Sequence, residues 1–124
     1  MKLKFQLPWP NPALNQNRTT GKHWGRTSAL RKKAKSDGFT LARAADPGQQ
    51  FYGILGDIAV TLTFFVPDER RRDQDNLLSA CKQNLDGIAL AIGVDDSQFE
   101  PVTLKRGYDV NKNGFVLVEL EVKT

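Results

Sequence analysis

Alternating apolar and polar residues predict that four segments of the chain are β-strands. Lys2–Leu7 alternates in this way before a run of prolines, and Asp57–Val66 places five apolar side chains on one face before Pro67 ends it. Near the C-terminus, Val102–Val110 and Phe115–Lys123 have the same period. The residues between these last two segments, Asn-Lys-Asn-Gly, are typical of a tight turn, so the two are predicted to form a β-hairpin.

Two further segments have the spacing of amphipathic helices. The first covers residues 27–45, with Gly38 as a weak point in it. The second covers Asp75–Ile92, and Gly93 follows it at a position where helices commonly end in a glycine. The order strand, helix, strand, helix, strand, strand predicts one α+β domain over residues 1–124. In this fold, a small mixed four-stranded sheet packs against two helices.

The composition is that of an ordinary globular domain and excludes several classes of protein. The 124 residues are 40% hydrophobic and 26% charged, and no apolar run approaches the ~18 residues that span a bilayer. The N-terminus lacks the apolar core of a secretory signal, and Cys81 is a single cysteine, so we expect a cytoplasmic protein. Because His23 is the one histidine, a His/Cys zinc site is excluded, and any catalytic metal would be a hard cation held by oxygen.

The net charge of +4 hides a difference between the two parts of the chain. Residues 1–50 contain ten basic and two acidic residues, a net of +8, whereas residues 51–124 contain eight basic and twelve acidic residues, a net of −4. A basic part indicates a polyanionic partner, and an acidic part indicates either solvation or cation binding.

Four aspartates near the second predicted helix are the main candidates for chemistry. Asp73 and Asp75 lie between the central strand and this helix, and Asp95 and Asp96 lie just beyond its end. Each position also has a structural explanation, since an aspartate before a helix is commonly an N-cap and Asp-Asp-Ser after one is commonly a solvated turn. If three of the carboxylates converge, their repulsion requires a cation. A Mg²⁺ ion held by these aspartates is then predicted.

The length of the second helix leaves the geometry of such a site open. A helix of about 18 residues is about 27 Å long, so its two ends do not share one site along a straight axis. Either the segment from Gly87 bends back, or the chain after Gly93 returns along the helix, or the two pairs of aspartates belong to different subunits.

Cationic side chains adjoin these aspartates. Three arginines directly precede the first pair: Arg70, Arg71 and Arg72. They are interpreted as a phosphate clamp, and a solvated charge run is the alternative. Lys82 follows Asp75 by seven residues, which places it about 20° from the same direction on a straight helix. It is a candidate catalytic residue, with a solvent-facing lysine as the alternative.

The loop before the first helix is rich in residues that suit contacts with nucleic acids. It contains Asn15, Asn17, Arg18, Lys22, His23 and Trp24. Cations interleaved with amides and an aromatic ring predict contacts with a DNA backbone, with Trp24 available for stacking. The alternative is that the cations of the following helix form its solvated face and that Trp24 packs at its start. His23 has no Ser or Cys partner that would indicate a catalytic triad.

Several motifs together resemble the RusA family of Holliday junction resolvases. They are Arg-Arg-Arg-Asp-Gln-Asp-Asn-Leu-Leu at 70–78, Leu-Asp-Gly-Ile at 85–88 and Val-Asp-Asp-Ser-Gln at 94–98. Leu-Pro-Trp-Pro at 7–10, Leu-Asn-Gln-Asn-Arg at 14–18 and His-Trp at 23–24 are similar to the same family. The resemblance therefore covers most of the chain.

The resemblance implies a Mg²⁺-dependent endonuclease, with Mn²⁺ as a substitute, that acts as a homodimer on four-way DNA junctions. It implies that Asp73, Asp75 and Asp96 match the essential metal-binding aspartates of the family. Asp95 is then a neighbour that also serves as a candidate ligand. Many members carry a lysine where this chain has Ser79, and Lys82 is the candidate substitute.

The leading hypothesis is therefore an endodeoxyribonuclease that resolves Holliday junctions by paired symmetric nicks during recombination and repair. One alternative is a binding protein for branched DNA that does not cut. The other is a nuclease for flaps or branches without preference for a junction. Clustered negative charge favours catalysis over binding alone, because a DNA-binding surface gains nothing from it.

Overall fold

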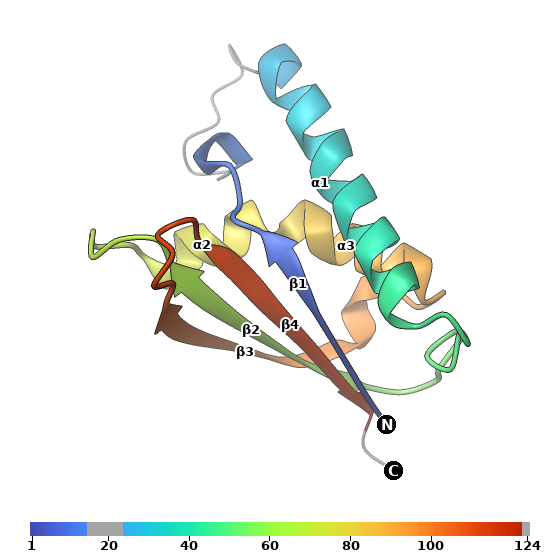
Figure 1. The fold of residues 1–124 in the computed structure, drawn as a ribbon. Helices are drawn as coiled ribbons and strands as arrows, with labels where there is room; N and C mark the ends of the chain where they lie inside the picture. Colours follow the sequence, from blue (N-terminus) through green and yellow to red (C-terminus); the bar gives the residue numbers. More distant parts are fainter. Residues whose placement is uncertain (15–23, 123–124) are drawn as a thin grey trace.

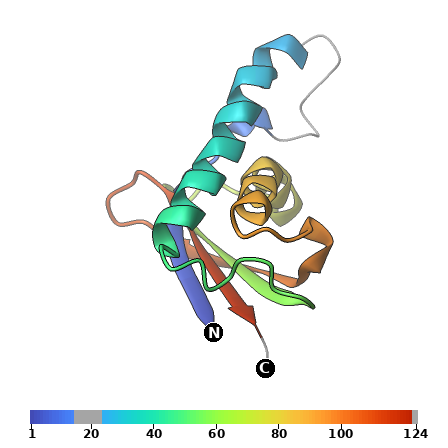
Figure 2. The same ribbon diagram turned by 90° about the vertical axis from the view of Figure 1, so that its right-hand side faces the viewer.

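Four strands form one mixed sheet, and the helices lie on one of its faces (Figures 1 and 2). The computed structural model describes residues 1–14 and 24–122, with the backbone alone for residues 24–26. The strands are β1 (Lys2–Pro8), β2 (Ile58–Val66), β3 (Phe99–Tyr108) and β4 (Phe115–Val122). They lie in the order β1-β4-β2-β3, which confirms the α+β class and the mixed four-stranded sheet.

The predicted alternation of strand β2 is confirmed residue by residue. Its side chains alternate between buried and half-buried along the whole strand, and Ile58, Val60 and Leu62 are completely buried under the helices. In β4, Val116 and Val118 are buried on the same face. Because side chains of a strand point alternately to the two faces of a sheet, this pattern gives one apolar face that packs on helices and one that meets solvent.

The prediction that the last two strands form a hairpin is wrong. β3 pairs in parallel with β2, whereas β4 lies between β1 and β2 and is antiparallel to both. The physical reason is burial, because the inward side chains of β4 require a central place, whereas most residues of β3 are exposed and suit the sheet edge. The Asn-Lys-Asn-Gly turn is held instead by Asp109, whose carboxylate accepts hydrogen bonds from the backbone N–H groups of Asn111 and Gly114.

The helical segments differ in detail from the prediction. The first helix, α1 (Trp24–Ala45), begins three residues before Thr27, and short 3₁₀ turns occupy Pro12–Leu14 (η1) and Asp96–Gln98 (η3). The single predicted helix over 75–92 is two helices, α2 (Gln74–Ala80) and α3 (Lys82–Ala91). They meet at Cys81, whose backbone N–H donates a hydrogen bond to the carbonyl oxygen of Leu78, three residues earlier. This 3₁₀-type turn ends α2. In the described chain, no helix is both long and apolar enough to cross a bilayer.

Close contact between α1 and α3 fixes the helical layer (Figure 2). Gly38 of α1 faces the backbone of Asn84, and Gly87 of α3 faces the backbone of Lys35. The buried Asn84 side chain donates a hydrogen bond of 2.8 Å to the carbonyl oxygen of Ala34. Gly38, expected to weaken its helix, is therefore a contact point where a side chain has no space.

Cys81 is buried at the junction between α2 and α3, and this burial raises the pKa of its thiol to about 12. Because the thiolate is the reactive form, the folded protein should react with a thiol reagent at pH 8 at least about 100-fold more slowly than the protein in denaturant. Stopped-flow or timed measurement of the released chromophore checks this prediction. Equal rates in the two conditions would contradict the burial of this thiol.

Candidate functional site

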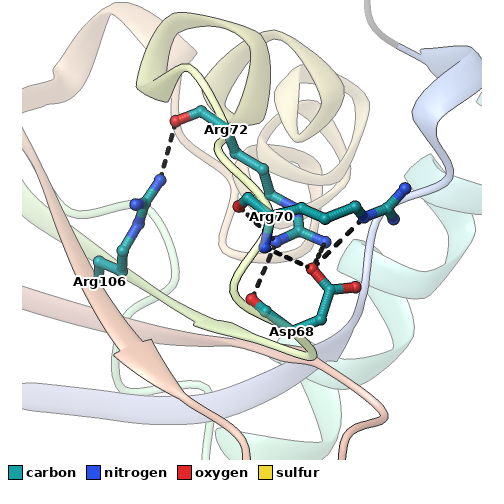
Figure 3. A network of polar contacts seen from close by, with 4 residues as sticks. All are labelled: Asp68, Arg70, Arg72 and Arg106. Carbon is teal, nitrogen blue, oxygen red and sulfur yellow. Dashed lines mark hydrogen bonds and ion pairs between the residues drawn. The ribbon is translucent and has the colours of Figure 1, made fainter.

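The loop between β2 and α2, residues 67–73, is ordered by the carboxylate of Asp68 (Figure 3). Its Oδ1 accepts a hydrogen bond of 2.9 Å from the backbone N–H of Arg70 and lies 2.8 Å from Nη2 of Arg72. The hydrogen bond from Arg70 is the main cause that lowers the pKa of Asp68, and the arginine side chains add to it. On the other side of the loop, Arg106 of β3 donates a hydrogen bond of 2.8 Å to the carbonyl oxygen of Arg72.

The three arginines of this loop have different environments. The side chain of Arg72 is only 13% exposed, and its guanidinium lies 5.4 Å from the ring centre of Trp9. Arg70 is 81% exposed and its Nε lies 3.4 Å from Oδ1 of Asp68, whereas Arg71 is exposed and makes no ion pair with any side chain that the structure describes. Arg72 therefore holds the loop in place, whereas Arg70 and Arg71 present their charge to solvent.

This difference gives a testable contrast between two adjacent arginines. Arg72→Ala should lower the melting temperature by a few degrees, because it removes the ion pair to Asp68 and the contact with Trp9. Arg71→Ala removes no described contact, so its melting temperature should match that of the wild type. Thermal denaturation followed by circular dichroism measures both, and equal melting temperatures for the two variants would refute a structural role for Arg72.

Asp73 and Asp75 both lie at the start of α2 and are exposed. Asp73 occupies the N-cap position, but its side chain makes no capping hydrogen bond, so capping does not account for its carboxylate. It lines an open polar depression of about 750 Å³ together with Arg71, Asn76 and Arg106. Asp75 lies in the first turn of the helix and lines neither this depression nor the neighbouring pocket described below.

Asp95 and Asp96 lie beyond the opposite end of α3 and have local structural partners. Asp95 caps η3 by accepting a hydrogen bond from the Ser97 N–H, which is the main cause that lowers its pKa. The pKa of Asp96 is raised, first by its side-chain hydrogen bond with Asp95 and then by slight burial and the negative charges of Asp95 and Asp86. The predicted solvated turn at this position is thus an ordered 3₁₀ turn that Asp95 caps.

One copy of the chain does not gather the four candidate metal ligands. Within residues 1–14 and 24–122, no three His, Cys, Asp or Glu side chains form a group that could hold a metal ion. The two routes by which a single chain would bring its aspartates together, a bend in the helix or a return of the chain, are therefore not realised. The third route, in which two subunits contribute to one site, stays a prediction.

Other predicted site residues are placed as follows. Lys82 is the first residue of α3 and is exposed, and the break at Cys81 removes the straight helix on which its alignment with Asp75 depended. Trp24 begins α1, and its side chain is not described. Five predicted DNA contacts lie outside the described residues: Asn15, Asn17, Arg18, Lys22 and His23.

Three residues at this site were not predicted as site residues. Arg106 reaches it because β3 pairs with β2 in a register that sets Arg106 beside Phe64, close to the start of the loop. The predicted hairpin paired β3 with β4 instead of β2, so Arg106 was not expected near the loop. Asn76 is in the motif at 70–78 and Trp9 is in Leu-Pro-Trp-Pro, so the sequence did contain a signal for both.

Comparisons with known proteins identify a relative without a stated function. No family model matches the chain. A protein of Xylella fastidiosa (strain Temecula1 / ATCC 700964), described as an uncharacterized protein, is 34% identical over 93 residues, which are 75% of this chain. The aligned part is 60% of that protein, so the chain spans about three fifths of the length of its relative.

Proposed function

We propose that this protein is a cytoplasmic endodeoxyribonuclease that resolves four-way DNA junctions by paired nicks in recombination and repair, as a Mg²⁺-dependent homodimer. The observation that carries the proposal is the cationic site around Asp73, where Arg71 and Arg106 line the same depression and Arg70 adjoins it. Guanidinium groups bind phosphates in pairs of parallel hydrogen bonds, so this site suits a DNA backbone. A carboxylate in the middle of it is unfavourable for binding alone and favours a role in cutting.

The oxygen ligands of Asp73 and Asp75 have the chemistry that Mg²⁺ prefers, since this ion is commonly held by one or two carboxylates and a substrate phosphate. The described residues of one copy do not form a complete site by themselves. Separation of the two aspartate pairs within a copy supports a dimer in which the second copy supplies the other pair. A twofold dimer also matches the symmetry of a four-way junction.

The test is cleavage of a synthetic four-way junction by the purified protein, compared with a flap and a linear duplex of the same sequence. We expect Mg²⁺-dependent nicks at symmetric positions of the junction and at least about tenfold slower cutting of the other two substrates. Equal rates on flap and junction would leave a branch nuclease without junction preference. No nicking with Mg²⁺ or Mn²⁺ would refute catalysis.

One observation favours a second function, a binding protein for branched DNA that does not cut. Three carboxylates do not gather within the described residues of one copy, so a single copy offers no metal site that includes Asp95 and Asp96. Within one copy, these two residues belong to an ordered turn. This function gives junction binding that does not change with Mg²⁺ and no nicks at any metal concentration. Gel-shift titrations with and without Mg²⁺, run beside the cleavage assay, separate the two functions.

A further inference from the structure

A second cavity adjoins the polar depression, and the two share four lining residues, Arg71, Arg72, Asp73 and Asn76. Its volume is about 240 Å³, and it is formed where the segment after β1 meets the start of α2. The walls are mostly apolar and come from Trp9, Pro10, Pro12, Leu77 and Ala80. Neither the nicking reaction nor phosphate binding requires apolar walls, so the function proposed above does not account for this part of the cavity.

The Trp9 wall is held in a fixed position. Its ring meets the ring of Phe64 edge to face, with centres 6.3 Å apart and planes at 87°, and the guanidinium of Arg72 lies over it. Gly114 approaches its ring so closely that an added Cβ would lie 3.0 Å from it. A wall held by three neighbours is preorganised, which reduces the entropy lost when a ligand binds.

The rest of the lining is polar or charged. Arg70 and Arg71 contribute exposed side chains, and Asp73 and Asn76 belong to the same lining. The site therefore combines an apolar slot with cations that are open to solvent. A ligand that matches both features has a flat, mainly apolar body and carries an anionic group.

We propose that this cavity binds the base of one unstacked nucleotide of the DNA, while Arg70 and Arg71 hold the phosphate next to that base. A nucleobase has a flat face for the apolar walls, and the phosphate next to it supplies the anion. The pocket shares Asp73 with the polar depression, so the bound base would lie next to the site of cutting. This inference rests on the proposed function, which makes DNA the ligand. It adds the residues of this cavity as determinants of which substrate is bound.

The test uses the full chain without added metal and two short fluorescent oligonucleotides. One is an oligothymidylate, and the other has abasic residues throughout and the same number of phosphates. Fluorescence anisotropy should show that wild-type protein binds the oligothymidylate at least about fivefold more tightly, because contact between a base and the apolar walls, Trp9 among them, adds to the affinity from the phosphates. Ala80→Leu, which fills the pocket, should abolish that preference and leave the abasic affinity unchanged. Trp9→Ala, which removes a wall, should abolish the preference as well.

Two single-charge variants serve as matched controls. Arg71→Ala should weaken both oligonucleotides by a similar factor, whereas Lys4→Ala, which removes one charge from β1 on the uncovered sheet face, should keep the ratio of the two affinities. The proposal is overturned if wild type binds both probes equally or if the preference survives both Ala80→Leu and Trp9→Ala. This test measures binding and not nicking, so its outcome does not depend on the proposed nuclease activity. If the protein shows the preference but does not cut junctions, the proposed nuclease is refuted and the nucleobase pocket is retained.

Discussion

Asp73→Asn should reduce nicking of a four-way junction by at least about 100-fold and leave the melting temperature unchanged. The carboxylate lies among arginines in the polar depression and makes no capping hydrogen bond, so the fold does not depend on its charge. Asparagine is as good an N-cap residue as aspartate, and α2 should therefore start at the same place. Single-turnover cleavage of a labelled junction measures the loss.

The matched control is Asp57→Asn, which makes the same chemical change at an exposed position just before β2. It should nick at the wild-type rate. Junction affinity of Asp73→Asn should equal or exceed that of the wild type, since the variant has one negative charge fewer beside the phosphates. Nicking by Asp73→Asn within a factor of about three of wild type would show that this carboxylate has no part in the reaction.

Gly87→Ala should lower the free energy of unfolding by about 3 kcal/mol or more, which corresponds to a fall in melting temperature of about 10 °C. A Cβ at this position would overlap the carbonyl oxygen of Lys35 and lie 2.9 Å from the backbone nitrogen of Phe39. Both atoms belong to the backbone of α1, so the overlap is relieved only by moving one helix away from the other. That movement would disturb the apolar layer beneath them.

Gly48→Ala provides the comparison, because an added Cβ there meets only the side chain of Gln50 at 3.9 Å. This variant should be as stable as wild type or slightly more stable, since alanine has fewer unfolded conformations. Urea denaturation of the two variants gives the difference. Equal stabilities for Gly87→Ala and Gly48→Ala would contradict the close approach of α1 and α3.

The local hydrophobic pattern was sufficient to predict the strands but not their order in the sheet. The alternation in Asp57–Val66 and Phe115–Lys123 depends on which side chains face the core, and burial confirms it at Val60, Val116 and Val118. The turn between the last two strands is a local signal, and it contains no information on whether a third strand lies between them. The exposure of most residues of β3 fits its place at the edge of the sheet, and this exposure is a property of the assembled sheet.

The candidate site shows the same division between local and distant information. The arginines and Asp73 were predicted because they are adjacent in sequence, whereas Arg106 joins them through strand pairing. The structural role of Arg72 was not predicted, because Asp68 and Trp9 hold it from two separate segments. Charge alone did not distinguish the largely buried guanidinium of Arg72 from the two exposed ones that precede it in the sequence.

The central place of β4 has a consequence for the order in which the chain can fold. β1 pairs with β4 from Lys2 opposite Glu121 to Pro8 opposite Phe115, so β1, which is made before the other three strands of the sheet, waits for β4, which is made after them. Until then β2 lacks its β4 neighbour, although β2 and β3 can already pair. Contacts between such distant segments slow folding and expose unpaired strand edges during synthesis. We therefore expect a nascent chain of this protein to complete this sheet only after β4 has left the ribosome.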